Sequence, residues 1–295
     1  MHACGVSRPD LGMREGRGTT DRPGAPLIPG MEIAGTVEAL GAAVQGWHVG
    51  DRVMARTGGG GYGSKLAVHA GLLVPIPSTL DFEQAAAVPD AFYTAFDALF
   101  RQAALQPGES VLIHAVGSGV GTAAVQLAAA AGCRVFGTAR SDEKLARAHA
   151  IGLDVGINAT QRDFADVIAE ETRGEGVDVI LDLVGGLYWT PTFRSAALLG
   201  RVVVIGTLGG ATVETDLRLL QGRRLRIFGT NLQRRALDEH VALARAVARQ
   251  VVPLFESRTV APVVDRVYPL AEVADAHRRM EANVAFGKLV LSHDR

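Results

Sequence analysis

Residues 111–122 read VLIHAVGSGVGT: an apolar run ends, glycines follow at once, and a helix of small residues begins (AAVQLAAAA, residues 123–131). A dinucleotide phosphate site requires this order, because glycines let the backbone turn tightly and approach a pyrophosphate. The start of the following helix offers N–H groups and the positive end of a dipole. A second strand (residues 133–138) ends about 20 residues on, where a Rossmann fold contacts the ribose. The stretch therefore predicts a Rossmann dinucleotide-binding unit.

The bulk composition narrows the function classes. At 295 residues the chain accommodates one large or two moderate domains, and a hydrophobic content of 48% supplies a large core. A net charge of −1 gives no general attraction to nucleic acid or to membranes. Two cysteines without a CxxC pair exclude a disulfide framework, and the sequence shows no signal-peptide core and no long uncharged apolar stretch. We therefore expect a cytoplasmic protein with no nucleic-acid or membrane partner.

The succession of sequence patterns indicates two domains. The first part has short strand candidates between Gly, Pro and Asp, at residues 32–39, 52–55, 65–68 and 73–76, and a helical pattern from 82 to 100. Strand cores then alternate with helices: strands at 111–114, 134–138, 154–157, 177–183, 202–205 and 225–229, and helices at 122–131, 142–151, 164–172, 190–197 and 237–249. This alternation predicts an α/β fold with a doubly wound parallel sheet. The tail (strand 262–268, helix 270–281, strand 288–291) predicts a return to the first domain.

Short motifs run along nearly the whole chain. They are GMEIAG (30–35), GDRV (50–53), GGY (60–62), YTAF (93–96), the glycine run, DLVGG (182–186), GT (206–207) and AFGKLVL (285–291). In this order they resemble the zeta-crystallin-like quinone oxidoreductase branch of the medium-chain dehydrogenase/reductase superfamily. The forms SGVG (118–121), GGLYW (185–189) and MEAN (280–283) are most similar to its tumour-suppressor-inducible type.

The resemblance implies an architecture. A GroES-like, β-rich catalytic domain would comprise residues 1–92 and 254–295, and a Rossmann NADP-binding domain would comprise residues 93–253, with a cofactor cleft between them. Pairing of Rossmann sheets in the family implies a homodimer. Family members carry a strand-rich opening before the element that here forms residues 3–10. The hypothesis is a late start or a natural truncation, with a catalytic domain under-stabilised by an open sheet edge.

The end of the second strand bears on the choice of cofactor. NAD enzymes place an acid there to hold the 2′-hydroxyl, but this chain has Thr138. Arg140 offers a planar fork to a phosphate and Lys144 a point charge, and Lys144 matches a phosphate-binding lysine of the resembled family. Ser141 also fits a helix cap, and Asp142 would favour NAD if it faced a ribose. The pattern favours NADPH.

Other cofactor contacts follow from strand ends and from the resemblance. Residues 206–207 and 230–232 follow the fifth and sixth strands, whose carboxyl ends border the ligand in this architecture. The resemblance places Thr94 near the nicotinamide. The expected cofactor-binding residues are Thr94, Gly117, Ser118, Gly119, Val120, Gly121, Thr138, Arg140, Ser141, Lys144, Gly206, Thr207, Asn231 and Leu232.

The catalytic candidates are Tyr62 and Ser7, and no metal site is expected. The zinc branch of the superfamily has Cys where Ser7 stands and His where Met31 stands, and neither Ser nor Met serves zinc. A substrate must then supply its own electrophilicity, as a quinone or a conjugated carbonyl compound does. Tyr62, on a glycine-rich loop, fits a hydrogen bond to the carbonyl, and it fits equally a lid contact without a chemical role. Ser7 replaces an Asn that usually lines the family's active site.

Three functions remain open. The leading one is a zinc-independent quinone oxidoreductase that transfers hydride from NADPH. An NADPH-dependent enal/enone reductase needs the same cleft. An NADPH-binding protein with little catalysis is favoured by the replaced Asn and by a second aromatic lost after Tyr62, where the chain reads GSKL (63–66). His48, His69, His240 and His277 have no acid or nucleophile partner by motif, and we expect them at the surface.

Overall fold

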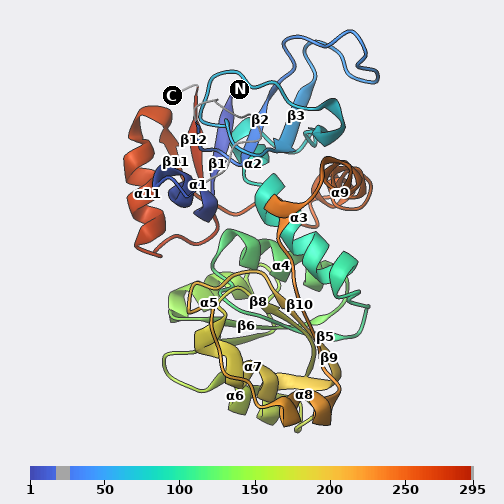
Figure 1. Ribbon diagram of the computed structural model, residues 1–295, viewed down its shortest axis with the longest axis vertical. Helices are drawn as coiled ribbons and strands as arrows, with labels where there is room; N and C mark the ends of the chain where they lie inside the picture. The colour runs from blue at the N-terminus through green and yellow to red at the C-terminus, as the bar shows by residue number, and fades with distance from the viewer. Residues whose placement is uncertain (18–26, 294–295) are drawn as a thin grey trace. The chain divides into compact units, whose positions relative to one another are not determined.

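The computed structural model describes residues 1–17 and 27–293, and the chain divides into two compact units. Unit 1 comprises Met1–Thr94 and Leu232–Arg295, and unit 2 comprises Ala95–Asn231. Each unit contains a six-stranded sheet (Figure 1). The sequence analysis placed residues 232–253 with the nucleotide-binding domain, whereas the structure groups them with unit 1. The reason is helix α9 (Leu237–Gln250), which packs against strand β4 (Val74–Pro75) of that unit.

Unit 2 is a doubly wound parallel sheet, which confirms the predicted fold class. Its strands are β5 (Ser110–Ile113), β6 (Arg134–Ala139), β7 (Val155–Asn158), β8 (Val177–Asp182), β9 (Ala196–Val204) and β10 (Arg226–Gly229). They lie in the order β10-β9-β8-β5-β6-β7, and every neighbouring pair is parallel. The direction of winding reverses between β5 and β8. An open α/β sheet binds its ligand beside this switch point, at the carboxyl ends of the strands.

Helices cover both faces of this sheet. Figure 1 shows α4 (Gly119–Ala130) and α5 (Asp142–His149) on one side, and α6 (Phe164–Glu171), α7 (Trp189–Ser195) and α8 (Leu217–Arg223) on the other. The strands read as nearly continuous apolar runs because both of their faces are buried. Leu112, Phe136 and Ile180 are completely buried in the resulting core. The sequence analysis missed α8, a short helix capped by Asp216, whose side chain accepts the Arg218 N–H.

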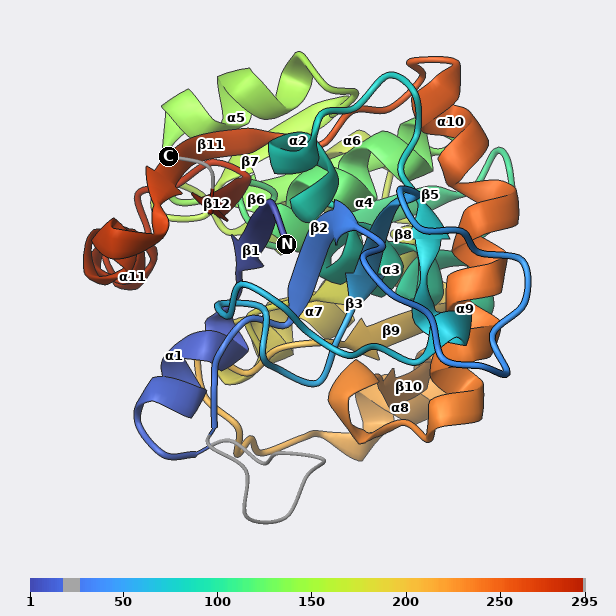
Figure 2. The same cartoon turned by 90° about the horizontal axis from the view of Figure 1, so that it is seen from above.

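Unit 1 contains a mixed sheet in the order β11-β12-β1-β2-β3-β4. Its strands are β1 (Ala3–Val6), β2 (Glu32–Thr36), β3 (Arg52–Arg56), β4, β11 (Val264–Pro269) and β12 (Lys288–Ser292). Figure 2 shows β12, β1, β2 and β3 side by side, because β1 pairs antiparallel with both β12 and β2. The tail of the chain therefore completes the sheet that the first residues begin. Residues 65–68, expected as a strand, are irregular, since β4 already occupies the edge of β3.

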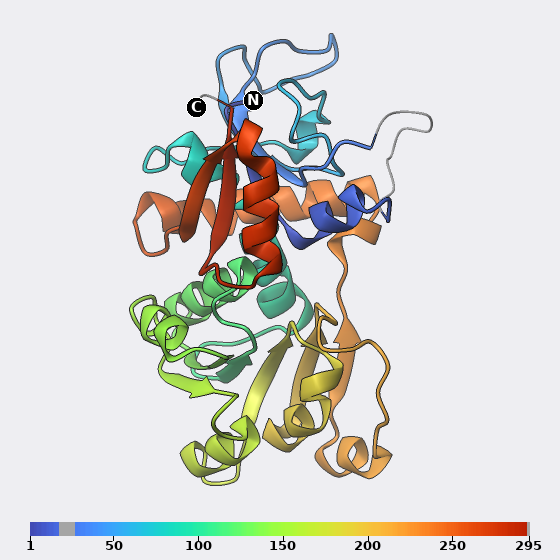
Figure 3. The same cartoon turned by 90° about the vertical axis from the view of Figure 1, so that its left-hand side faces the viewer.

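Most of the remaining helices belong to unit 1, and single turns of helix occur in both units. The α-helices are α1 (Arg8–Arg14), α2 (Phe82–Ala86), α3 (Pro89–Phe96), α9, α10 (Val252–Glu256) and α11 (Val273–Glu281). The other turns of helix are η1 (Ala70–Leu72), η2 (Asp97–Gln102), η3 (Gly186–Tyr188), η4 (Leu232–Arg234) and η5 (Leu270–Glu272). Figure 3 shows α11, in red, against β11 and β12. Within residues 1–17 and 27–293, every helix is too short or too polar to span a lipid bilayer.

Candidate functional site

The glycine run of unit 2 forms the turn between β5 and α4. Ser118 caps α4, and its hydroxyl accepts the Gly121 N–H at 3.0 Å. A Cβ on Gly121 would lie 2.4 Å from the Ala115 carbonyl oxygen and 2.8 Å from the Val116 Cα, both backbone atoms. Only glycine fits this close approach of helix and strand. The geometry matches the turn that presents a helix N-terminus to a pyrophosphate, so these residues fit a dinucleotide.

Thr138, at the end of β6, lies in the core of unit 2. Its side chain is completely buried, and its Oγ1 lies 3.0 Å from Nδ1 of His114. The second ring nitrogen of His114 lies 3.1 Å from the hydroxyl of Thr192. Burial lowers the pKa of His114 to about 3, so the imidazole is neutral and bonds two hydroxyl groups. The sequence analysis did not foresee this contact, and a role for Thr138 in cofactor binding stays a prediction.

The polar side chains that follow β6 have different surroundings. Both oxygens of the Asp142 carboxylate accept hydrogen bonds, one from Asn158 at 2.7 Å and one from Gln161 at 3.1 Å. Ser141 caps α5 and accepts the Lys144 N–H at 3.4 Å. Arg140 is exposed. It lines a cavity of about 300 Å³, together with Ala159, Thr160, Arg162, Asp163, Phe164, Leu187, Tyr188 and Pro191.

The remaining predicted cofactor residues belong to different units. Gly206 and Thr207 follow β9 in unit 2, and the Gly206 N–H donates to the Asp182 carbonyl at 3.2 Å. Asn231 is the last residue of unit 2. Thr94 and the buried Leu232 belong to unit 1. None of these placements tests the predicted contacts with a cofactor.

Ser7 lies in a cluster of buried charged side chains in unit 1. Its hydroxyl accepts a hydrogen bond from Lys288 Nζ at 2.8 Å. The same oxygen lies 2.8 Å from Asp90 Oδ2 and 3.1 Å from Glu32 Oε1. A serine hydroxyl has one proton, so it donates to only one of the two acids at a time. Arg56 donates from Nε to the other oxygen of Asp90 at 3.1 Å.

The acids of this cluster differ in their electrostatics. Burial raises the pKa of Glu32 to about 7, and the Lys288 charge only partly opposes it. Burial also acts on Asp90, but Arg56 and Lys288 outweigh it and lower the pKa of Asp90. For Lys288 the effect of burial is overcome by Glu32 and Asp90, which raise its pKa. Glu32 is therefore the member of the cluster that titrates near neutral pH.

Tyr62, half-buried in a turn after β3, contacts a histidine. Its hydroxyl oxygen lies 2.8 Å from Nε2 of His277, which is only 4% exposed. The expectation that His277 is a surface residue was wrong, because α11 turns this side chain towards the sheet that it covers. Burial, and next the Asp10 carboxylate, raise the pKa of Tyr62, so the phenol stays protonated. No sequence signal links Tyr62 to His277, since the two are 215 positions apart.

Asp10 is the second group that the sequence analysis missed. One carboxylate oxygen accepts the Ser7 N–H at 2.7 Å, and the other accepts the Gly30 N–H at 2.8 Å. Burial raises the pKa of Asp10 to about 6. Glu32 and Lys288 were missed too, although each lies in a motif that the sequence analysis quotes. The two motifs are visible in the sequence, but the ion pair between Glu32 and Lys288 forms only in the folded chain and could not be predicted from either motif.

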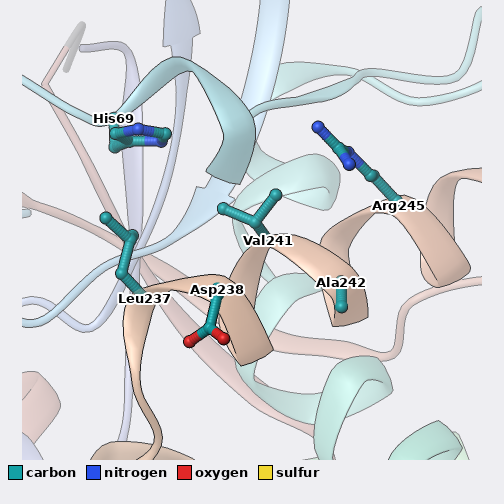
Figure 4. Close-up of a pocket in the computed structure, with 6 residues that line it drawn as sticks. All are labelled: His69, Leu237, Asp238, Val241, Ala242 and Arg245. Atoms are coloured by element: carbon teal, nitrogen blue, oxygen red, sulfur yellow. The ribbon is translucent and has the colours of Figure 1, made fainter.

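A metal centre and a cavity in unit 1 are the two other features to compare with these sites. Among the described residues, no group of three or more His, Cys, Asp and Glu side chains is arranged to hold a metal ion. A cavity of about 560 Å³ lies along α9 in unit 1 (Figure 4). It is lined by His69, Leu237, Asp238, Val241, Ala242 and Arg245. None of these is a predicted catalytic residue or a predicted cofactor residue.

Two family models match separate parts of the chain, and curated relatives cover nearly all of it. The model of the alcohol dehydrogenase GroES-like domain matches residues 1–78, and that of zinc-binding dehydrogenases matches residues 119–248. Quinone oxidoreductase of Rattus norvegicus is 32% identical over 293 residues, which are 99% of this chain and 87% of that protein. The synaptic vesicle membrane protein VAT-1 homolog-like of Homo sapiens is 32% identical over 316 residues, covering 100% of this chain and 74% of that protein.

Solved structures agree with this relationship. An NAD-dependent alcohol dehydrogenase superposes with a TM-score of 0.88 at 30% identity, covering 99% of this chain and 90% of that chain. A quinone oxidoreductase of Pseudomonas syringae gives 0.87 at 30% identity, with 99% and 89% covered. The JamJ enoyl reductase gives 0.86 at 28% identity, also with 99% and 89% covered. The chain is therefore an oxidoreductase of the medium-chain dehydrogenase/reductase superfamily, and it fits the quinone oxidoreductase branch of that superfamily.

Proposed function

We propose that this oxidoreductase reduces a quinone with hydride from NADPH and without zinc. The observation that carries the proposal is the similarity to quinone oxidoreductases over nearly the whole chain, combined with the intact glycine turn of unit 2. NADPH supplies a hydride when it is bound. The polypeptide then has to hold the cofactor, orient the substrate carbonyl, and provide a proton.

The environment of Asp142 supports NADPH over NADH. NAD enzymes hold the ribose 2′-hydroxyl with a carboxylate, whereas the Asp142 carboxylate accepts hydrogen bonds from Asn158 and Gln161, which use one site on each oxygen and orient it within unit 2. Arg140 is exposed beside a cavity that Arg162 also lines. Arg162 pairs with Glu170 at 2.9 Å, which leaves Arg140 as the better candidate for the 2′-phosphate. Lys144, in the first turn of α5, is the second candidate.

Tyr62 and Ser7 are the groups that we assign to the substrate carbonyl. Because the pKa of Tyr62 is raised, its hydroxyl remains a hydrogen-bond donor throughout the physiological pH range. Ser7 receives the Lys288 hydrogen bond and donates its own proton to one acid, so a substrate oxygen would have to take the place of that acid. Tyr62 is therefore the stronger candidate.

Zinc independence rests on the residues at the two ligand positions. Ser7 is engaged by Lys288, and Met31 is buried with its sulfur 4.0 Å from Gln233 Nε2. Neither side chain is a zinc ligand of the usual kind. Dialysis against a chelator should leave the quinone-dependent rate unchanged. Stoichiometric zinc in elemental analysis of the purified protein would refute this part of the proposal.

The second candidate is an enal or enone reductase, which the similarity to the JamJ enoyl reductase favours. The test is NADPH oxidation with a panel of quinones and a matched panel of conjugated enals and enones. A higher kcat/KM for quinones supports the leading proposal, and the reverse order supports the second. If neither panel oxidises NADPH while the protein binds it, the protein is a binding protein rather than a reductase.

We also infer a cytoplasmic homodimer. The two cysteines, Cys4 and Cys133, are buried free thiols, as expected in a reducing compartment. Strand β10 forms one edge of the parallel sheet, and unit 2 exposes several large apolar side chains: Leu198, Leu199, Leu208 and Leu217. These leucines are the apolar side chains that we propose for a subunit interface. Light scattering on the purified protein measures the oligomeric state directly.

A further inference from the structure

Three side chains from distant parts of unit 1 contact one another in sequence: Tyr62, His277 and Arg14. Tyr62, in the turn after β3, lies with its hydroxyl oxygen 2.8 Å from Nε2 of His277 on α11. The other ring nitrogen of His277, Nδ1, lies 3.4 Å from a terminal nitrogen of Arg14 on α1. Arg14 in turn pairs with Glu281, one turn further along α11. These contacts connect the exposed Arg14–Glu281 ion pair to the half-buried phenol of Tyr62.

The chemistry of arginine fixes the tautomer of the histidine. A guanidinium group donates hydrogen bonds and never accepts one, so Nδ1 of His277 must be the acceptor. Burial and the Arg14 charge lower the pKa of His277 and outweigh the opposing effect of Glu281, so the imidazole is neutral at neutral pH. A neutral imidazole has one N–H. With Nδ1 as the acceptor, the proton is on Nε2 and points at Tyr62.

The direction of the next hydrogen bond follows. Because Nε2–H donates to the Tyr62 oxygen, the phenol uses that oxygen as an acceptor and keeps its own proton for another group. Burial raises the pKa of Tyr62, and the nearby buried groups Asp10, Cys4 and Glu32 raise it further, so the phenol keeps this proton. The proton of Tyr62 is therefore directed away from Nε2 of His277.

We propose that His277 is a positioning residue that fixes the Tyr62 hydroxyl as a donor by occupying its oxygen with Nε2–H. The phenol proton is then available to form a hydrogen bond with the substrate carbonyl. This last step rests on the proposed function, whereas the tautomer and the direction of the Nε2–H hydrogen bond do not. Arg14 acts one step further out, as the donor that sets the tautomer.

Kinetics test the role of His277 with two variants. His277→Leu removes the donor and should lower kcat with a quinone roughly tenfold, the equivalent of one lost hydrogen bond, while KM for NADPH stays unchanged. His277→Gln keeps an N–H donor on a side chain of similar reach and should recover most of the rate. In a Tyr62→Phe background, His277→Leu should have no further effect on kcat. An equal loss in both backgrounds, or no recovery with Gln, would overturn the proposal.

Nuclear magnetic resonance tests the same geometry without any turnover. In ¹⁵N-labelled protein the His277 resonances, assigned by comparison with His277→Gln, should show the Nε2–H tautomer at neutral pH. An Nδ1–H tautomer or a charged ring would contradict the inferred hydrogen bond. A wild-type protein that shows Nε2–H but reduces no carbonyl substrate would refute the proposed function and still confirm the orientation. Circular dichroism of each variant checks that the fold is intact.

Discussion

Lys288 Nζ lies 2.5 Å from Glu32 Oε1, and both side chains are buried. The lysine stands on β12 and the glutamate on β2, the two strands on either side of β1. Lys288 also donates to the Val6 carbonyl at 2.7 Å, which ties the last strand of the chain to the first. A buried ion pair of this kind is expensive to break, because the remaining partner is left as an uncompensated charge.

Replacing Lys288 by methionine should destabilise unit 1. Lys288→Met keeps the length of the side chain but leaves Glu32 unpaired and Ser7 without its donor, so we expect a loss of about 3–5 kcal/mol. Urea denaturation followed by circular dichroism measures it. The matched control is Lys65→Met, since the Lys65–Glu38 pair is exposed at 72% and 65% and should contribute at most about 1 kcal/mol. Equal effects of the two substitutions would contradict this reading of the cluster.

Glu32 should make stability depend on pH. Its pKa is raised from the usual 4.5 to about 7, so between these values the folded state binds the proton and the unfolded state does not. The contribution of Glu32 is therefore complete below pH 4.5 and is lost as the pH rises to about 7. Glu32→Gln removes this titration. The difference in unfolding midpoint between wild type and variant should shift in favour of the variant across this window, and a constant difference would refute the assignment.

The charges beyond β6 should determine which cofactor binds. Arg140→Ala or Lys144→Ala should weaken NADPH binding roughly 10- to 100-fold, because each removes a charge-assisted contact of about 1.5–3 kcal/mol. NADH binding should barely change, since NADH has no 2′-phosphate. Isothermal titration measures both affinities. Arg218→Ala is the control, because Arg218 is exposed on α8, on the other face of the sheet from α5 (Figure 1). Tighter binding of NADH than of NADPH by the wild type would refute the NADPH proposal.

The strands and helices of unit 2 could be predicted because their signals are local. Strands buried on both faces read as apolar runs, so β5, β6 and β8 were found within one or two residues. Strand β1 was missed because its four residues, ACGV, are too short a run to predict a strand, and they form one by pairing with β12 and β2. Residues 65–68 show the reverse case: the short run KLAV was expected as a strand, but β3 already pairs with β4 at this edge.

Single candidate residues of the site could be predicted from the sequence, but the contacts between them could not. Tyr62 and Ser7 were predicted as single residues from their own side-chain chemistry, and their catalytic roles stay predictions. His277 was assigned to the surface because no motif pairs it with an acid or a nucleophile, whereas its partner lies 215 positions away. The burial that sets the pKa of Glu32 likewise depends on packing from three strands. Neither property can be read from neighbouring residues.

The glycine turn of unit 2 allows a test that separates binding from folding. Gly121→Ala places a Cβ 2.4 Å from the Ala115 carbonyl oxygen, and because backbone atoms cannot move aside cheaply, α4 must shift away from β5. We expect both a lower stability of unit 2 and weaker NADPH binding, because the same shift displaces the N–H groups that meet the pyrophosphate. The control is Gly222→Ala on α8, where a Cβ meets no atom within 4 Å. There the substitution should stabilise the helix by about 0.5–1 kcal/mol and leave NADPH affinity unchanged. Thermal unfolding with and without NADPH measures both effects for each variant, and an alanine at Gly121 that leaves the NADPH-induced shift intact would show that this turn does not hold the cofactor.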